Sequence, residues 1–281
     1  PGTRRLSDII LINDFNCLDF LSRCFQWNPN EQFIDEKALE NLDAIIHLAG
    51  ANISKRWTKN YKKELFESRI NTANLLKKYC QKNNIHLKAF ISASGVNCYG
   101  TFTSDEILNE DSGIIQNDFL SKLCAEWEQA ADQFSDLSDR VVCLRTALVL
   151  GKNGGVFPFL RKITDLNLGA AIGSGKQWMN WIHLEDLVNL YVFALEKPTI
   201  NGKYHAVADD IPPNKKFMKT LARMLCKFFI SLSNLCLYNF NFYVIFKASI
   251  CIFKQKHDCV NTCEILLINI EPIQHILPVI P

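Results

Sequence analysis

No glycine-rich phosphate-binding loop is present anywhere in this sequence of 281 residues. The chain contains twelve glycines, but no group of them has the spacing GxGxxG or GxxGxxG. In such a loop the glycines let backbone N–H groups approach a pyrophosphate at the N-terminus of a helix, an approach that other residues do not permit. The sequence therefore predicts no phosphate grip of this kind among its own residues.

The chain also lacks a CxxC pair, although it has eleven cysteines. That number is odd, and residues 1–5 are polar and are not followed by the apolar core of a signal peptide. These features favour free thiols in a reducing compartment over a disulfide framework, so we expect a cytoplasmic protein. Cys259 and Cys263 form the closest pair, but no second pair or well-spaced histidine accompanies them, so no metal site is predicted.

Neither sign of charge is in large excess. The formal net charge is +2 and the isoelectric point is about 8.1, which gives no reason to expect nucleic acid or an anionic membrane as a partner. Hydrophobic residues make up 48% and charged residues 21% of the chain, as in globular proteins. The length suits one large α/β domain or two smaller ones.

Buried strands and amphipathic helices alternate through the middle of the chain. Apolar runs at 43–50, 89–95 and 140–151 read as buried strands, and helical spacing of apolar residues fills 58–82 and 118–134. This alternation predicts βαβ units, and thus a doubly wound parallel sheet with helices on both faces. Ligands of such sheets bind beyond the carboxyl ends of the strands.

The chain changes character after residue 151. Six glycines between residues 151 and 175 mark a loop-rich stretch, which we expect to fold over the ligand site. A helix ending near residue 195, a short strand at 203–208 and a helix at 214–225 are predicted to follow. Together these observations predict a substrate-side region after the parallel sheet.

Both ends of the chain are harder to interpret. Residues 9–12 could form a short strand, but nothing nearby offers a partner. The segment 228–253 has the length of a membrane span. However, Asn234, Asn239, Asn241 and Lys247 would be costly in its middle, so a membrane anchor is disfavoured. A tail that arises from a changed reading frame or splice is the alternative.

Several motifs occur in the order found in extended short-chain dehydrogenases/reductases. They are His47-Leu48-Ala49-Gly50, Ser68-Arg69-Ile70-Asn71-Thr72-Ala73-Asn74-Leu75-Leu76, Ser92-Ala93-Ser94 with Tyr99-Gly100, Leu144-Arg145-Thr146, and Gly173-Ser174-Gly175-Lys176-Gln177 with Trp181-Ile182-His183-Leu184-Glu185-Asp186-Leu187. With Lys55-Arg56-Trp57 and Trp127-Glu128, the chain most resembles NAD(P)-dependent epimerase/dehydratase-like proteins of the "epimerase family" group. The resemblance covers about residues 25–225.

This resemblance implies a Rossmann-type fold, NAD or NADP as cofactor, and a nucleotide sugar as the small-molecule substrate. It also implies that most of the first βαβ unit, with the glycine loop, lies upstream of Pro1, so we expect a truncated family member. The strand at 43–50 would then lose a partner at the sheet centre, which is an aggregation hazard. Helices flanking the fourth strand often form dimers in relatives, so a homodimer is expected by analogy.

The catalytic pair of the superfamily is altered in this chain. Its Tyr-x-x-x-Lys motif places an acid/base phenol one helical turn from a lysine. The matching residues here are Asp118 and Lys122, and a carboxylate ionised at neutral pH is a poor proton donor unless burial raises its pKa. Tyr99 is the candidate substitute or a packing tyrosine. Ser94 is either the hydroxyl donor to a sugar keto group or a turn serine.

The resemblance also assigns cofactor and substrate residues. Contacts with the cofactor are expected from Leu48, Ala49, Gly50, Asn71, Ser92 and Lys122, with Arg4 and Arg5 at the 2′-phosphate of NADP or simply solvated at a chain end. Substrate contacts are expected from Gln177, Trp178, Trp181 and His183, although the tryptophans and the histidine could instead belong to the core.

Three regions and three functions follow from these patterns. The regions are an incomplete NAD(P)-binding domain at 1–165, a substrate-side region at 166–225, and a hydrophobic tail at 226–281 without resemblance to the family. The functions are an NAD(P)-dependent epimerase or dehydratase, a non-catalytic dinucleotide-binding scaffold or sensor, and a truncated product without activity.

Overall fold

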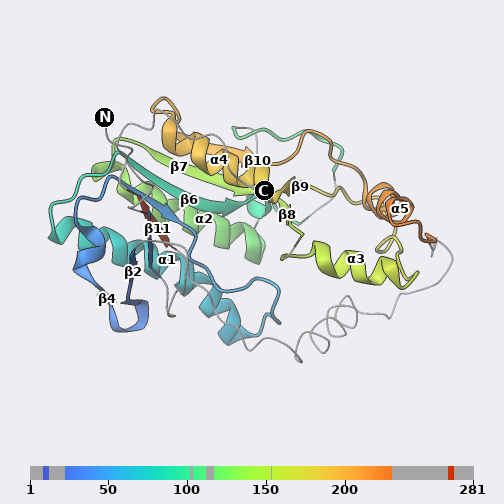
Figure 1. Ribbon diagram of the computed structural model, residues 1–281, viewed down its shortest axis with the longest axis horizontal. Coiled ribbons are helices and arrows are strands. Elements are labelled where there is room, and N and C mark those ends of the chain that lie inside the picture. Colours follow the sequence, from blue (N-terminus) through green and yellow to red (C-terminus); the bar gives the residue numbers. More distant parts are fainter. Residues whose placement is uncertain are drawn as a thin grey trace.

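A seven-stranded sheet forms the centre of the computed structural model (Figure 1), which describes residues 9–12, 23–101, 104–111, 117–152, 154–229 and 265–268. The strand order is β10-β7-β6-β5-β11-β1-β2. In that order the strands span Gly202–Ala206, Val141–Thr146, Ala89–Gly95, Ala44–His47, Ile265–Ile268, Ile9–Ile12 and Arg23–Phe25.

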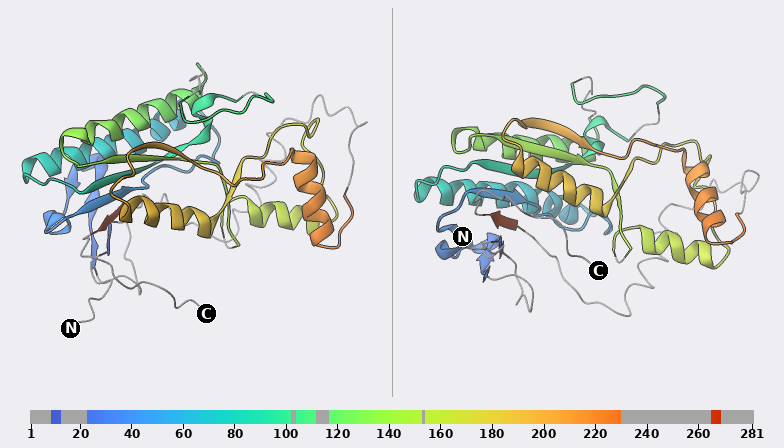
Figure 2. Two further views of the ribbon diagram at one scale, coloured as in Figure 1. Left: turned by 90° about the horizontal axis from the view of Figure 1, so that it is seen from above. Right: turned by 45° about the horizontal axis from the view of Figure 1, so that its top comes forward.

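Helices cover both faces of this sheet. Strands β10, β7, β6 and β5 run parallel. Figure 2 shows α1 (Lys59–Lys82) and α2 (Phe119–Asp132) on one face and α4 (Leu184–Glu196) on the other. The predicted α/β fold, a doubly wound parallel sheet, is therefore confirmed for this half of the molecule.

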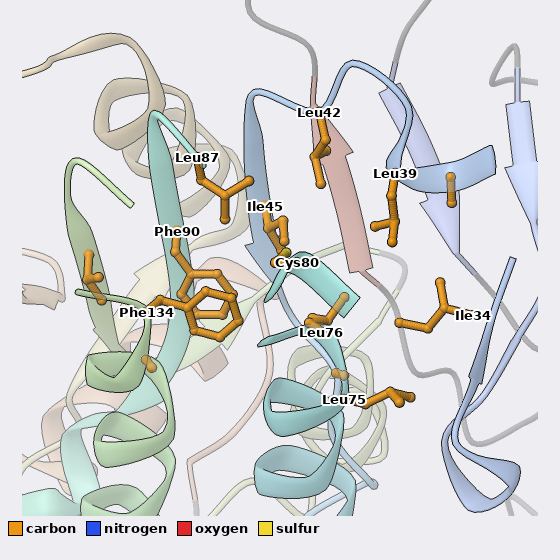
Figure 3. Close-up of a cluster of buried hydrophobic side chains, with 14 of the residues drawn as sticks. Ile34, Leu39, Leu42, Ile45, Leu75, Leu76, Cys80, Leu87, Phe90 and Phe134 are labelled. Atoms are coloured by element: carbon orange, nitrogen blue, oxygen red, sulfur yellow. The ribbon is translucent and has the colours of Figure 1, made fainter. Parts of the chain in front are cut away.

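Successive side chains of β6 point to opposite faces of the sheet, and both faces are buried. Phe90 points toward α1 and α2, where its ring stacks on Phe134 with centroids 3.7 Å apart (Figure 3). Ile91, one residue further, packs instead with Ala194 and Leu195 of α4. A strand enclosed in this way reads as a continuous apolar run, which is why the sequence predicted it.

The predicted strand at 140–151 proves to be two strands. β7 ends at Thr146, and β8 (Leu148–Leu150) pairs with β9 (Trp181–His183) in a separate two-stranded sheet. The change occurs at Ala147, whose N–H still donates to Ala206 at 3.1 Å, while the next N–H, of Leu148, donates to Asn180 at 3.1 Å. The chain thus leaves the main sheet here and leads to α3 (Phe157–Asp165) and, later, to α5 (Asn214–Met224).

Strand β11 corrects two expectations about the chain ends. It lies antiparallel between β5 and β1, with Ile265 opposite His47 and Ile268 opposite both Ala44 and Ile9. β1 also pairs in parallel with β2, so residues 9–12, which appeared to have no partner, have two. The expectation that the strand at 43–50 would lack a partner at the sheet centre is also wrong.

The remaining elements are short. A small antiparallel pair, β3 (Trp27–Asn28) and β4 (Phe33–Ile34), leads into the 3₁₀ helix η2 (Glu36–Leu39), and further 3₁₀ turns are η1 (Pro29–Glu31), η3 (Val96–Tyr99) and η4 (Gln133–Asp136). None of the helices in the part of the chain that the structure describes is both long enough and apolar enough to cross a membrane. The segment 228–253 lies almost wholly outside that part.

Candidate functional site

A cavity of about 450 Å³ lies at the carboxyl ends of β6 and β7. The end of β6 contributes Gly95, the following 3₁₀ helix η3 contributes Val96 and Asn97, and the end of β7 contributes Thr146. The remaining wall comes from Ile53, α1, α2, Ala147, the start of β8 and residues 178–180 before β9. The cavity therefore occupies the edge where the parallel sheet predicts a ligand.

Among the described residues of this wall, Arg69 of α1 is the charged one, and the residue as a whole is 8% exposed. Nη1 donates to the carbonyl of Leu65 at 3.0 Å and Nη2 to the carbonyl of Ala51 at 3.2 Å. The Cζ atom lies 4.8 Å from the ring centroid of Trp127 on α2, a cation–π contact. We did not predict a site role for Arg69, although the sequence carries a signal: it lies four residues after Leu65, on the buried stripe of the helix.

Ser94 does not line the cavity; its side chain points toward α2. Its hydroxyl donates to Oε1 of Glu128 at 2.7 Å, within the interior. Glu128 also accepts from Nε of Arg145 at 2.9 Å and, through Oε2, from Nη2 of the same residue at 3.0 Å. Ser94 and Arg145 are opposite one another on β6 and β7, so both reach the same carboxylate. Burial alone would raise the pKa of Glu128, but the bonds from Arg145 and Ser94 hold it below its usual range.

Tyr99 belongs to the same network. Its hydroxyl accepts from Nη1 of Arg145 at 2.7 Å, donates to the carbonyl of Asn109 at 3.1 Å, and lies 2.5 Å from Nε2 of His205. Burial raises the pKa of Tyr99, and the positive charge of Arg145 opposes that rise. Like Ser94, it is outside the cavity wall and its hydroxyl is engaged. The placement suits the packing alternative more than a proton donor to a ligand.

Asp118 is the N-cap of α2. Its Oδ1 accepts from the N–H groups of Leu120 at 2.9 Å and Ser121 at 3.0 Å, and its Oδ2 accepts from Thr101 at 3.2 Å. The bonds from Ser121 and the other N–H groups lower the pKa of this carboxyl group, so it is ionised at neutral pH. This geometry gives no support to Asp118 as a proton donor. Lys122, one turn on, is exposed and does not line the cavity.

The residues expected near the cofactor are spread over the segment after β5, strand β6 and helix α1. Ala49 and Ser92 are buried; the Ser92 hydroxyl donates to the carbonyl of Ala93 at 3.0 Å. Asn71 is exposed on α1, and Leu48 is partly buried on the α4 side of the sheet. Gly50 lies beside Arg69, where an added Cβ atom would be only 2.9 Å from Cζ of that residue. Arg4 and Arg5 lie outside the described residues.

Of the residues expected near the substrate, only Trp178 lines the cavity. It is 41% exposed, and its Nε1 donates to the carbonyl of Ser104 at 2.8 Å. Trp181 donates to the carbonyl of Asp210 at 2.9 Å, and Gln177 to that of Ile172 at 2.8 Å. His183 is the N-cap of α4, where Nδ1 accepts from the N–H of Glu185 at 3.4 Å. These three side chains therefore hold loops and a helix end in place.

The parallel sheet, the helices on both its faces and the cavity at its carboxyl edge define a Rossmann-type α/β protein. The model of the NAD dependent epimerase/dehydratase family matches residues 28–207. The chain belongs to this family.

Two proteins named as members of the epimerase family are similar in sequence to this chain. Epimerase family protein SSP1921 of Staphylococcus saprophyticus is 34% identical over 194 residues, which cover 67% of this chain and 63% of that protein. Epimerase family protein Mb2239 of Mycobacterium bovis is 34% identical over 198 residues, covering 70% and 64%. The chain thus spans a little under two thirds of the length of these relatives.

Solved structures are similar too. Human epimerase family protein SDR39U1 (isoform 2), crystallised with NADPH, is 32% identical with a TM-score of 0.67, covering 78% of this chain and 72% of that one. The nucleoside-diphosphate sugar epimerase from Corynebacterium glutamicum is 29% identical with a TM-score of 0.61, covering 76% and 49%.

The described residues are better suited to the nicotinamide end of a dinucleotide than to its pyrophosphate. The cavity, at about 450 Å³, is large enough for a ring-sized group, and Trp127, Leu120 and Trp178 are among its lining residues. At the neighbouring position in the sheet, β11 runs antiparallel to β5, so its amino end lies at the ligand edge. A pyrophosphate is held at the carboxyl end of a parallel strand that turns through glycines into a helix, whereas β11, being antiparallel, presents its amino end at this edge.

Proposed function

We propose that this chain belongs to an NAD(P)-dependent epimerase or dehydratase that acts on a nucleotide sugar or a related carbonyl compound, with the reacting groups in the cavity. The observation that carries the proposal is the position of the cavity, at the carboxyl ends of β6 and β7. The human relative crystallised with NADPH and the Corynebacterium relative named as a nucleoside-diphosphate sugar epimerase support it.

The chain's own residues would bind and orient the reactants. Trp127 and Trp178 offer aromatic surfaces to a planar ring, and Asn97, Asn180 and Thr146 offer neutral hydrogen-bonding groups. A bound nicotinamide would supply the hydride donor or acceptor. The Ser94–Glu128–Arg145 network would keep the ends of β6 and β7 in register behind the cavity.

A non-catalytic binding protein is the second candidate, and one observation favours it. Among the described residues that line the cavity, the titratable side chains are Arg69 and Cys124. Burial raises the pKa of the Cys124 thiol to about 12, and an arginine side chain stays protonated in proteins, so neither is suited to exchange protons at neutral pH. A protein that binds a dinucleotide without turning over substrate would need no acid or base here.

Hydride exchange separates these two functions. The chain is incubated with millimolar deuterated NADPH or NADH and a panel of nucleotide keto-sugars, whose carbonyl carbon accepts the deuteride while its oxygen takes a proton from water, and deuterium in the sugar is measured by mass spectrometry. An enzyme transfers the label to at least one sugar, and Ala147→Phe, which fills the cavity wall, abolishes the transfer while circular dichroism confirms the fold. Binding of the cofactor without any transfer across the panel would establish the non-catalytic function instead.

A further inference from the structure

Two side-chain amides in the wall of the cavity are left without a partner. Asn97 of η3 and Asn180, which directly precedes β9, both line the cavity and are exposed. Neither amide group makes a hydrogen bond within the part of the chain that the structure describes. An amide carries two N–H donors and a carbonyl acceptor, so each of these side chains can exchange hydrogen bonds with a ligand in both directions.

Three other polar side chains of the described wall are already bonded to the protein. The guanidinium nitrogens of Arg69 donate to two backbone carbonyls and to a serine hydroxyl. The hydroxyl of Thr146 donates to the carbonyl of Leu144 at 3.1 Å, and the indole N–H of Trp178 donates to the carbonyl of Ser104 at 2.8 Å. A ligand would have to break one of these bonds to use those groups, whereas the two amides are available at once.

The two asparagines lie on neighbouring segments at the carboxyl edge of the sheet. Gly95 of β6 and Thr146 of β7 form the last pair that joins these strands, and Asn97 follows Gly95 by two residues. The carbonyl of Asn180 accepts from the N–H of Leu148 at 3.1 Å, which is likewise two residues beyond Thr146. Both amides therefore belong to the part of the wall that lies just past the end of the sheet.

An aromatic surface lies beside these amides. Trp178 lines the cavity two residues before Asn180, is 41% exposed, and is held by its bond to Ser104. A sugar ring has apolar C–H groups on its faces and hydroxyl groups around its edge. It can therefore lie against an indole ring while its hydroxyl groups bond to the amides.

The same wall is less favourable to a sugar that carries a carboxylate. A hydroxyl group both donates and accepts, so it can satisfy the N–H groups and the carbonyl of an amide, whereas an ionised carboxylate only accepts. Arg69, the charged residue of the described wall, already donates to protein oxygens. A carboxylate that enters the cavity would lose water without gaining a cation that is free to bond to it.

We propose that Asn97 and Asn180 determine the substrate specificity of the cavity by bonding to the hydroxyl groups of a neutral sugar ring that lies against Trp178. The inference rests on the proposed function for its assignment of the cavity to the substrate. It adds the substrate's class, a nucleotide sugar whose sugar ring carries no carboxylate. The two amides bind and orient the ring and take no part in proton transfer.

Methyl glycosides test this preference in the full chain without any nucleotide. The methyl glycosides of glucose, galactose and mannose are each compared with the matching uronate, in which a carboxylate replaces the CH₂OH group. Titrations are followed by NMR at the side-chain NH₂ resonances of Asn97 and Asn180 and the indole N–H of Trp178. At least one neutral glycoside is expected to shift these resonances with saturable millimolar binding, about tenfold tighter than its uronate.

Variants assign the binding to the two amides. Asn97→Ala and Asn180→Ala, which also assign the NH₂ resonances, are each expected to weaken binding of the neutral glycoside about fivefold to tenfold, as for one net hydrogen bond. Asn189→Ala, at an exposed asparagine of α4 outside the cavity wall, is the matched control and is expected to bind like the unaltered chain. Circular dichroism confirms that each variant is folded.

Three results would overturn the proposal. They are no saturable binding of any neutral glycoside, binding of the uronates that is as tight as that of the neutral glycosides, and unchanged binding in folded Asn97→Ala or Asn180→Ala. Each result is read from the same titrations.

Hydride exchange distinguishes this inference from the proposed function. Binding of a neutral glycoside that depends on both asparagines, together with no transfer of deuterium to any nucleotide keto-sugar, would retain the sugar site and reject the enzymatic function. Transfer of deuterium that is unchanged in Asn97→Ala and Asn180→Ala would reject the role of the asparagines alone.

Discussion

Glu128 and Arg145 form the most heavily bonded side-chain pair at the carboxyl edge of the sheet. Both are buried, with side chains 3% and 8% exposed, and two hydrogen bonds join them at 2.9 and 3.0 Å. Lys203 lies 3.5 Å from Oε2 of Glu128, and Ser94 donates to Oε1. Glu128 therefore links the carboxyl ends of β6 and β7 to α2. Loss of either Glu128 or Arg145 would leave the other charge buried without its partner.

Removing one member of this pair is expected to destabilise the fold. Arg145→Met or Glu128→Gln should lower the free energy of unfolding by about 3–5 kcal/mol, because the remaining charge stays in the interior. Arg161→Met, which removes an exposed helix pair with Asp165, should cost less than about 1 kcal/mol. Urea unfolding followed by circular dichroism measures both; equal effects of the buried and exposed changes would refute the structural role.

His47 predicts a pH dependence of stability. Its pKa is lowered from 6.5 to about 3 in the folded state, so between these values the unfolded state binds more protons than the folded state. Stability is thus lost as the pH falls through this window, by about 2 kcal/mol at pH 5 from this group alone. His47→Gln should show a correspondingly smaller loss between pH 8 and pH 5 in urea unfolding; an unchanged loss would show that His47 is not held neutral.

At the scale of elements, α2 depends on its cap. Asp118 accepts bonds from the N–H groups of Leu120 and Ser121. Asp118→Ala should cost about 0.5–2 kcal/mol of stability, whereas Asp118→Asn, which can still cap, should cost little. Measurement of the same two variants for hydride exchange tests the alternative role, because activity lost in folded Asp118→Asn would show that the carboxylate takes part in the reaction.

Elements with a local signature could be predicted from the sequence, and those defined by distant pairing could not. The buried run at 89–95 and the apolar stripe at 58–82 agree with β6 and α1 to within one residue. The break between β7 and β8 left no such signature, because apolar residues continue across Ala147 while its hydrogen-bond partners change. β11 is four residues long and pairs with β5, more than two hundred residues earlier in the chain.

The central place of β11 leads to a prediction at this scale. Leu267 lies opposite Ile45 of β5, and Leu267→Pro would remove an N–H from a strand paired on both sides. Hydrogen exchange should then become at least about tenfold faster at the amides of Ala44–His47. Leu267→Ala, which keeps the N–H, is the matched control; equal exchange in the two variants would argue against β11 at this position.

At the scale of the whole molecule, the sequence predicted where the candidate site lies but not which side chains line it. The carboxyl edge of the parallel sheet follows from the alternation of strands and helices, and the cavity lies there. Side-chain direction did not follow from the sequence: Ser94 turns to Glu128, 34 residues away, and Tyr99 to His205, 106 residues away. Arg69 went unnoticed as a site residue because its partners at Ala51 and Trp127 come together only in the folded chain.

The chain belongs to a known family, but one position of its central sheet is occupied by an antiparallel strand. The parallel half and the cavity agree with an NAD dependent epimerase/dehydratase, while β11 is antiparallel where a dinucleotide grip would need a parallel strand and a glycine turn. We therefore propose that these residues bind the nicotinamide end and the substrate in the cavity and contribute little to holding the pyrophosphate.

Titration of this chain with NADPH and with reduced nicotinamide mononucleotide, each followed by nicotinamide fluorescence, measures whether the nicotinamide end alone accounts for binding. Because both molecules would be held through the nicotinamide end, their dissociation constants are expected to agree within about threefold, a difference below about 1 kcal/mol. Ala147→Phe should abolish the binding of both. NADPH bound about a hundredfold more tightly than the mononucleotide, or binding of both unaffected by Ala147→Phe, would contradict the account.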